Sequence, residues 1–404
     1  MYNRRGIIAG YSETCTTERV SPEELIALQE MKLRAVINYS ARNVPYYREL
    51  FARAGVRPET FDGLTDLKRI PPLSRQDLVD NRERLIDSRY IGSANRLNDR
   101  LCVPGEPMLF SRFHRYPLVK NTSSGSTGAP TVFYENGVVS ATSWSNELRV
   151  KCWFGVNPGI REVRLVRLSP DFVINSRANR MRQLLWNQLV MPGVNLTDKE
   201  YELIIEELHR FNPKTIWAFT SAIAGLARYV NENHLSIDSC RPSLVMTWAA
   251  PLYENEHEAI KKAFSCAVTN IYGMREVGHI GAFCPAGSLH VFQETHLLET
   301  DSNGELLVTF LKPSPMPFIR YRTGDVGELA TLRCACGRNL QIIERFHGRT
   351  GEIFITENGK MFSPNFWCRT FMDAVLAQTV KRFQVIYTKD GVIRIKLVAN
   401  PTHR

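Results

Sequence analysis

The sequence predicts an α/β protein with a large N-terminal domain, in which mixed and parallel sheets are flanked by helices, plus a β-rich subdomain and a small α+β C-terminal lobe. Apolar strand-like runs alternate with helical stretches between residues 163 and 272, which is typical of a largely parallel sheet. After residue 289 short strands and turns replace this alternation. We therefore expect two domains, residues 1–348 and 349–404.

Capping residues and apolar periodicity predict helices in the first third of the chain. Ser21 is a favourable N-cap residue, and Pro22 would occupy the first helical position. Ser74 with Asp77 predicts a second helix start. The expected helices span residues 21–40, 47–54, 74–85 and 136–154, and residues 90–120 are expected to be irregular.

The middle of the chain should form the parallel sheet. Strands are expected at residues 163–168, 215–219, 244–248 and 267–272, with helices at 198–211, 221–231 and 255–264 between them. Ligands bind beyond the carboxyl ends of such strands. The segment Tyr272-Gly273-Met274-Arg275-Glu276 follows the last strand and is therefore placed at a candidate site.

Turn residues predict three hairpins near the end of the chain. Their turns are residues 302–304, 358–359 and 390–391, and their strands are 297–299 with 306–311, 353–356 with 361–362, and 380–388 with 392–399. A helix is expected between the last two hairpins, from Ser363 to about residue 376.

Residues 122–128 consist only of Ser, Thr and Gly, which suits neither a packed helix nor a packed strand. Gly125 and Gly128 allow close backbone approach, and successive N–H groups with nearby hydroxyls can bind an anion. The segment has no Gly-Lys-Ser/Thr ending, so it is not a Walker A loop. It is predicted to bind phosphate, although a mobile Ser/Gly linker has the same composition. Residues 131–134 after it read as a short strand.

Bulk composition narrows the classes of partner. The net charge of +10 favours anionic partners such as nucleotides, coenzyme A or acidic carrier proteins. Basic residues are scattered without a run of five, so no nucleic-acid partner is expected. No apolar run of about 18 residues and no secretory signal are visible, so we expect a cytoplasmic protein without a membrane partner. The nine cysteines favour reduced thiols or a metal site over a disulfide framework.

Three distant segments together carry a family resemblance: the Ser/Gly loop, Tyr272–Glu276 and Thr323-Gly324-Asp325. In combination they resemble the adenylate-forming superfamily of acyl-CoA synthetases, peptide-synthetase adenylation domains and luciferases. More narrowly, the chain resembles the phenylacetate–coenzyme A ligase branch and its CapK-like relatives. Supporting segments lie in the family's order at residues 28–29, 43–47, 64–67, 287–290, 319–325 and 334–338.

The resemblance implies a nucleotide-binding role for each motif. Tyr272, followed by Gly273, would stack on adenine, and Asp325 would accept hydrogen bonds from both ribose hydroxyls. Arg349 would lie at the lobe junction, near the ribose or a phosphate. The residues that would hold the β- and γ-phosphates of ATP are Ser123, Ser124, Gly125, Ser126, Thr127 and Gly128. Taken alone, Asp325 also fits a simple turn residue.

The resemblance also implies the residues close to the chemistry. Glu276 would hold Mg²⁺, and Tyr134 would lie beside the acyl group. Arg275 stands where relatives carry Ser or Thr, and would either add positive charge or obstruct the α-phosphate site. Glu276 also fits a helix cap, and Tyr134 a core residue. Trp217, Phe219 and Trp248 fit the core, although the family's acyl pocket is lined by such positions.

The implied reaction is attack of a carboxylate, expected to be aromatic, on the α-phosphorus of ATP to give acyl-AMP and pyrophosphate. The acyl group would then pass to a thiol or amine in a biosynthetic pathway. Coenzyme A, an acidic carrier protein and an amine stay open as acceptors, and a homodimer is a further expected partner. ATP and Mg²⁺ are the expected cofactors.

Cys284, His290, Cys334 and Cys336 form a second constellation. Relatives carry cysteines and a histidine in these places, so the resemblance implies a closed, structural zinc site. The Cys-x-Cys spacing is tighter than usual for zinc, and unmetallated thiols remain the alternative. His279 is a reserve ligand.

The chain also departs from the family pattern. Ala129 stands where relatives usually carry Lys, and the final lobe shows no equivalent of the family's C-terminal lysine. We therefore expect a truncated lobe and slow adenylation. The alternative function is a relic that binds nucleotide or acyl-AMP without turnover.

Overall fold

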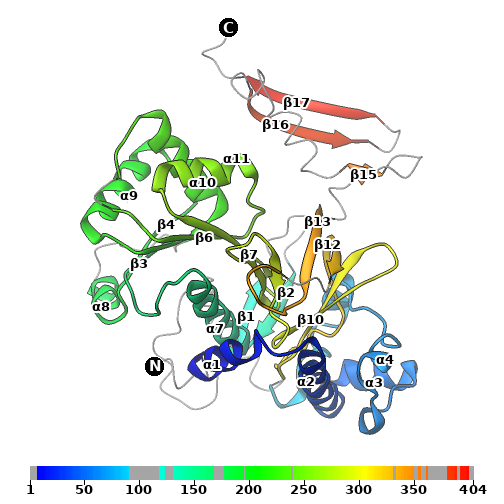
Figure 1. The fold of residues 1–404 in the computed structure, drawn as a ribbon. Coiled ribbons are helices and arrows are strands. Elements are labelled where there is room, and N and C mark those ends of the chain that lie inside the picture. Colours follow the sequence, from blue (N-terminus) through cyan, green and yellow to red (C-terminus); the bar gives the residue numbers. More distant parts are fainter. Residues whose placement is uncertain are drawn as a thin grey trace.

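The computed structural model describes residues 7–90, 118–122, 131–167, 177–194, 196–237, 240–330, 334–349, 354–355, 361–362, 380–388 and 392–399. Within these ranges the predicted α/β fold is confirmed (Figure 1). An eleven-stranded mixed sheet forms its centre, and helices pack against its faces.

The described helices largely follow the predicted ones. They are α1 (Ile7–Thr17), α2 (Pro22–Asn43), α3 (Pro45–Ala54), α4 (Gly63–Leu67), α5 (Arg75–Asp80), α7 (Val138–Trp153), α8 (Arg177–Trp186), α9 (Asp198–Phe211), α10 (Thr220–Glu232) and α11 (Glu254–Phe264), with 3₁₀ turns at Pro58–Thr60 and Ser88–Tyr90. No helix in the described ranges has the length and apolarity needed to cross a bilayer.

The strands extend from the middle of the chain to its last described residues. They are β1 (Val119–Thr122), β2 (Val132–Glu135), β3 (Glu162–Val166), β4 (Gln188–Pro192), β5 (Thr215–Phe219), β6 (Leu244–Trp248), β7 (Ala267–Met274), β8 (Gly278–Phe283), β9 (Leu289–Val291), β10 (His296–Thr300), β11 (Glu305–Phe310), β12 (Tyr321–Ala330), β13 (Ile342–Arg349), β14 (Phe354–Ile355), β15 (Met361–Phe362), β16 (Val380–Tyr387) and β17 (Ile393–Ala399).

The predicted capping residues act as caps. Ser21 forms a capping box with Glu24 at the start of α2, and Ser74 forms one with Asp77 at the start of α5. Gly55 ends α3 with a φ of 64°, in the left-handed region that glycine favours. Helix α5 ends at Asp80, five residues before the predicted end at residue 85, and residues 81–85 form turns.

The parallel half of the sheet has the strand order β4-β3-β5-β6-β7. Helices α9, α10 and α11 lie on one face, and α7 lies on the other (Figure 1). Two separate apolar clusters follow from the alternation of side chains along these strands. The first joins Ile204, Leu208, Ile223 and Ile260 to Val163, Ile216 and Val245, and the second joins Val150 and Trp153 to Trp217 and Met246.

Strand β7 connects this parallel half to an antiparallel half. Residues 267–270 pair in parallel with β6, whereas residues 271–274 pair antiparallel with β8. The sheet then continues in the order β8-β9-β13-β12-β11-β10. The β-rich part therefore extends the parallel sheet edge to edge.

A cluster of four charged side chains is buried between α7 and β3. Lys151 contacts both Glu147 (3.0 Å) and Glu162, and Arg164 contacts Glu147 and Glu162 (2.6 Å). None of the four residues is more than 6% exposed. Gln188 adds a hydrogen bond of 2.8 Å to Glu162. Each cation thus contacts both carboxylates.

The predicted hairpins are confirmed where they are described. Strands β10 and β11, β14 and β15, and β16 and β17 pair antiparallel. The turns at 358–359 and 390–391, the helix expected from Ser363, and most of the irregular 90–120 stretch lie outside the described residues.

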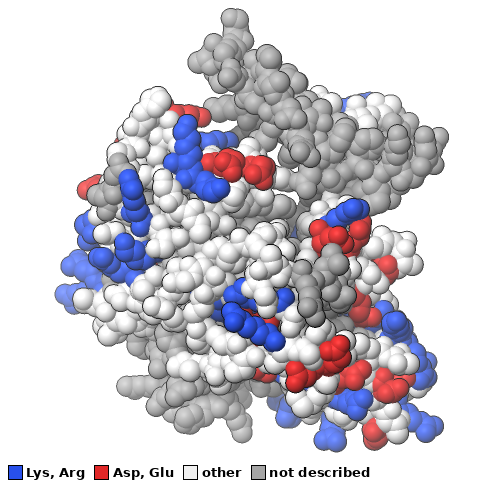
Figure 2. Space-filling view, viewed as in Figure 1, with Lys and Arg blue, Asp and Glu red and all other residues white. Residues whose placement is uncertain are grey.

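Figure 2 shows Lys and Arg spread over the visible face and mixed with Asp and Glu around α2, α3 and α4, in keeping with their scattering along the sequence.

Candidate nucleotide site

The proposed ribose ligand, Asp325, lies between two other predicted site residues. The Tyr272 hydroxyl donates a hydrogen bond to Asp325 Oδ2 at 2.9 Å. Arg349 Nε lies 3.5 Å from Asp325 Oδ1, because Asp325 on β12 and Arg349 on β13 are directly paired. Asp325 is only 8% exposed. The structure therefore brings together residues that lie up to 77 positions apart in the sequence.

The ring of Tyr272 is also fixed in place. It packs edge to face against Phe346 of β13, with ring centroids 5.3 Å apart. Burial, and then the neighbouring Asp325 carboxylate, raise the pKa of Tyr272 well above its usual value. The hydroxyl therefore stays protonated and continues to donate to Asp325. Gly273 follows at a bulge in the β7–β8 pairing, where a Cβ atom would come within 2.4 Å of the Gly278 carbonyl oxygen.

Glu276 is a buried carboxylate just beyond β7. It is 6% exposed, and the Tyr321 hydroxyl lies 3.4 Å from its Oε1. Burial raises the pKa of Glu276, while the positive charges of Arg75 and Arg349 act in the opposite direction. A carboxylate in this setting can serve as an oxygen ligand for a hard cation such as Mg²⁺.

Arg275 points to the end of β1. Its Nη1 donates to the carbonyl oxygen of Thr122 at 2.6 Å. Burial, followed by repulsion from Arg167, lowers the pKa of Arg275. Thr122 is the last residue before the predicted phosphate-binding segment, Ser123–Gly128, which lies outside the described residues together with Ala129. The predicted roles of those residues therefore stay predictions.

Tyr134 lies on β2, which pairs with β1 as part of a short hairpin. Its side chain packs against the same apolar cluster as Tyr272. This packing agrees with a core role, and the predicted place of Tyr134 beside the acyl group stays a prediction.

Three aromatic side chains stack at the carboxyl ends of β5 and β6. Phe219 and Trp248 have ring centroids 4.6 Å apart, and Trp248 and Trp217 have centroids 5.7 Å apart. Both indole N–H groups are buried and have no hydrogen-bond partner in the described part of the chain. Two such donors form an unusual feature for a plain core, because buried polar groups are normally paired.

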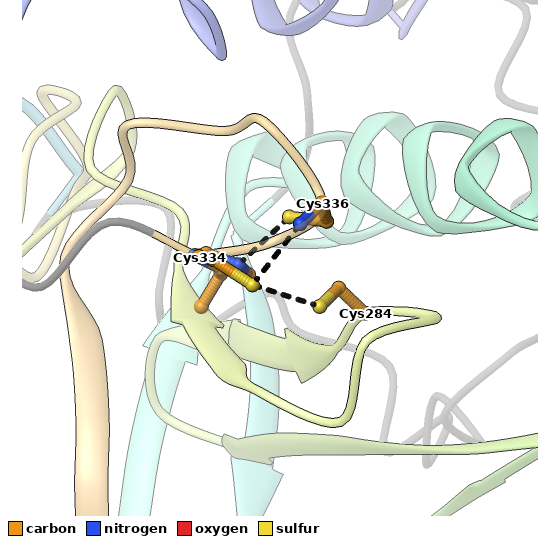
Figure 3. A group of neighbouring side chains, drawn as sticks. Cys284, Cys334 and Cys336 are labelled. Carbon is orange, nitrogen blue, oxygen red and sulfur yellow. Dashed lines mark hydrogen bonds between the residues drawn. The ribbon is translucent and has the colours of Figure 1, made fainter.

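The four predicted zinc ligands converge, and Figure 3 shows how the three cysteines face one another. Their ligand atoms all lie within 4.8 Å of one another. Cys284 Sγ is 3.6 Å from Cys334 Sγ, and Cys336 Sγ is 3.3 Å from His290 Nε2. His290 Nδ1 lies 3.1 Å from the Leu340 carbonyl oxygen, so its other nitrogen faces the thiols. Three thiols and one imidazole in this arrangement fit a tetrahedral zinc site.

The reserve ligand, His279, lies elsewhere. Its Nδ1 is 3.1 Å from the Ser143 carbonyl oxygen, and its ring is 5.3 Å from that of Trp217. Sequence reasoning did not single out Arg75, Phe346 or Tyr321. Arg75 directly follows the predicted N-cap residue Ser74, Phe346 lies in no predicted element, and Tyr321 lies in the supporting segment 319–325 without a role of its own.

Comparison with curated proteins supports the resemblance. No protein-family model matches the chain. The phenylacetate-coenzyme A ligase of Thermus thermophilus is 26% identical over 398 residues, which cover 93% of this chain and 81% of that protein. The CapK protein of Staphylococcus aureus is 24% identical over 319 residues, which cover 76% of this chain and 63% of CapK. The predicted resemblance to this branch is confirmed.

Solved structures agree with this result. A 2-hydroxyisobutyryl-CoA ligase in the postadenylation state, in complex with 2-HIB-AMP, matches with a TM-score of 0.71 at 17% identity, over 95% of this chain and 80% of that one. The fold is that of an adenylate-forming ligase. This adenylate-forming fold, together with relatives that are named ligases, bears out the expectation of a ligase enzyme.

Proposed function

We propose that this chain activates a carboxylic acid with ATP, releases pyrophosphate, and passes the acyl group from acyl-AMP to a thiol or amine. The observation that carries the proposal is that Asp325 contacts both Tyr272 and Arg349, and that Arg349 lies close enough to the buried Glu276 to favour its ionised form. This grouping combines a ring for adenine, a carboxylate for the ribose and a ligand for the cation at one end of β7.

The physical problem in this reaction is that two anions must meet in line. Glu276 would hold Mg²⁺ together with phosphate oxygens, and the bound ion would neutralise phosphate charge. Arg275 and Arg349 would hold their positive charges on the phosphate side. Asp325, fixed by Tyr272 and Arg349, would orient the ribose so that the α-phosphorus faces the acid.

The acid in this proposal is aromatic. Phe219, Trp248 and Trp217 form a stack at the carboxyl ends of β5 and β6, where ligands of parallel sheets bind. A flat ring would find stacking partners there. The two indole N–H groups, which find no partner among the described residues, would favour a ring that carries a hydrogen-bond acceptor.

Coenzyme A, a carrier protein and an amine are all compatible with the second step. The solved 2-hydroxyisobutyryl-CoA ligase in complex with 2-HIB-AMP and CoA makes coenzyme A the first acceptor to test. The proposal further includes a biosynthetic role in the cytoplasm, a homodimer, and a division of the chain into residues 1–348 with the site and 349–404 as a separate lobe.

The test is exchange of labelled pyrophosphate into ATP in the presence of a panel of acids. We expect exchange with aromatic acids, less exchange with short aliphatic acids, and none without Mg²⁺. Calorimetry with ATP is run in parallel. Arg275 and Ala129 motivate the alternative, a nucleotide-binding relic, and ATP binding without exchange for any acid would favour it. If ATP does not bind at all, both functions are wrong.

The four-ligand cluster would hold zinc, with Cys284, Cys334 and Cys336 as thiolates and His290 through Nε2. The ion would be structural, because four protein ligands leave no open position. It would tie the turn after β8 to the turn between β12 and β13.

Metal analysis of the purified chain is expected to find about one zinc per molecule. Chelation should lower the unfolding temperature by roughly 4 °C, because a loss of about 3 kcal/mol is divided by an unfolding entropy of about 0.8 kcal/mol/K for a chain of 404 residues. Cys336→Ser should lose the zinc, and Cys15→Ser, which changes an exposed thiol, should keep it. The site would be refuted if wild-type protein is purified without zinc and its unfolding temperature changes neither on adding zinc nor on adding a chelator.

A further inference from the structure

Two arginines reach the same end of the β1–β2 hairpin from different elements. Arg275, just after β7, donates to the Thr122 carbonyl oxygen at 2.6 Å. Arg75, the first residue of α5, donates from Nε to the Thr131 hydroxyl, also at 2.6 Å. Thr122 pairs directly with Val132 in the β1–β2 ladder, so Thr131 and Thr122 are neighbours. The two guanidinium groups therefore both contact the end of the hairpin where β1 and β2 are joined through the connecting segment.

The charges around this hairpin end are mostly positive. Arg75 lies close enough to Glu276 to favour its ionised form, as does Arg349. Arg167, directly after β3, lies close enough to Arg275 to repel it. Three arginines, Arg75, Arg275 and Arg349, thus lie near one buried carboxylate, and Arg167 lies near Arg275. Such an arrangement lowers its energy by binding a polyvalent anion.

Arginine is well suited to binding the phosphate groups of such an anion. A guanidinium group remains charged at any working pH and offers five N–H donors in a planar fork that matches phosphate oxygens. The hydrogen bond from Nε to Thr131 holds the guanidinium group of Arg75 beside the hairpin. Thr122 does the same for Arg275.

We propose that Arg75 and Arg275 bind the polyphosphate of ATP from the two sides of the β1–β2 hairpin. Together they supply the positive charge that Ala129 does not provide. This inference rests on the proposed function, because it names further ligands of the same nucleotide. Its new element is the ligand role of Arg75, which acts together with the charge that the proposed function already gives to Arg275.

Calorimetry of the full-length chain with Mg-ATP, AMP and inorganic pyrophosphate tests the proposal. Arg75→Ala and Arg275→Ala should each raise the ATP dissociation constant by about 10- to 100-fold, the range for a lost charge-assisted contact. AMP affinity should change by less than about threefold, since the proposal places both groups on the phosphates that AMP lacks. Arg75→Lys should recover part of the ATP and pyrophosphate affinity, because it keeps the charge.

The outcomes separate this inference from the proposed function. Arg84→Ala, which removes an exposed partner of Glu49, is the matched control and should bind ATP like wild type. Unchanged ATP affinity in Arg75→Ala would overturn the inference while leaving the function intact. Equal losses for ATP and AMP would also overturn it, because they indicate a purely structural role. Wild-type protein that binds no adenine nucleotide would overturn both.

Discussion

Replacing Asp325 with alanine is expected to weaken ATP binding by about 100-fold or more. The carboxylate is proposed to accept hydrogen bonds from both ribose hydroxyls, and a hydrogen bond to a charged group contributes roughly 1.5–3 kcal/mol. Two such bonds exceed roughly 2.7 kcal/mol, which is 100-fold in a dissociation constant. The substitution also leaves Arg349 and the Tyr272 hydroxyl without this partner. Calorimetry with ATP measures the effect directly.

Adenosine binding and a matched variant show whether the lost ribose contacts cause the loss of ATP affinity. Asp325→Ala removes a negative charge near the phosphate side, so its loss of affinity should be at least as large for adenosine as for ATP. Tyr272→Phe removes the hydrogen bond to Asp325 and keeps both the ring and the carboxylate. That variant should lose less than about tenfold. An Asp325→Ala protein that is folded and binds adenosine like wild type would contradict the assignment.

Replacing Lys151 with methionine should destabilise the folded chain by about 3–5 kcal/mol, the cost of removing one partner from a buried ion pair. Lys151 is 6% exposed and contacts both Glu147 and Glu162, so its loss leaves two buried carboxylates to share Arg164. Urea unfolding followed by tryptophan fluorescence reports on this region, because Trp144 and Trp217 flank Arg164.

An exposed ion pair provides the comparison. Arg84 lies 2.5 Å from Glu49, and both side chains are largely exposed to solvent. Arg84→Met should therefore change stability by less than about 1 kcal/mol. The double variant Glu147→Gln with Lys151→Met should lose less than the sum of its single variants, because one acid and one base are removed together. If Lys151→Met and Arg84→Met lower the free energy of unfolding equally, burial of the ion pair does not determine its contribution to stability.

The same cluster predicts a dependence on pH. Burial alone would raise the pKa of Glu162, but Arg164 and Lys151 outweigh this effect and lower it to about 2, from a usual value of 4.5. The ionised carboxylate therefore stabilises the folded chain fully above pH 4.5, and this contribution is lost as the pH falls toward 2. The difference in stability between wild type and Lys151→Met should shrink over that interval.

Much of the fold could be predicted because local signals and tertiary packing agree. Helix α9 and strands β5 and β6 have the predicted bounds, since each combines a clear apolar pattern with defined ends. Helix α1 was not predicted, because few of its residues are apolar and buried. Strand β4 was missed because nothing marks the start of its short apolar run, which directly follows α8.

The candidate site was predictable only in part, for a related reason. Tyr272, Glu276 and Asp325 lie in recognisable motifs; Tyr272 donates to Asp325, and Arg349 contacts Asp325 and favours the ionised form of Glu276. Arg75 approaches Glu276 through the packing of α5 against the β1–β2 hairpin, and no local pattern encodes that contact. Side chains that meet through long-range packing carry no signature in a single sequence.

Strand β7 has a consequence for the spacing of the two proposed substrates. Trp248 on β6 lies level with Ile271, because Thr247 pairs with Asn270, and Tyr272 is the next residue along β7. Adjacent strands are about 4.8 Å apart, and successive strand residues are separated by about 3.3 Å. The offset between the aromatic stack and Tyr272, the proposed partner of adenine, is thus set by covalent geometry and backbone hydrogen bonds. Core substitutions that loosen side-chain packing should leave that offset unchanged.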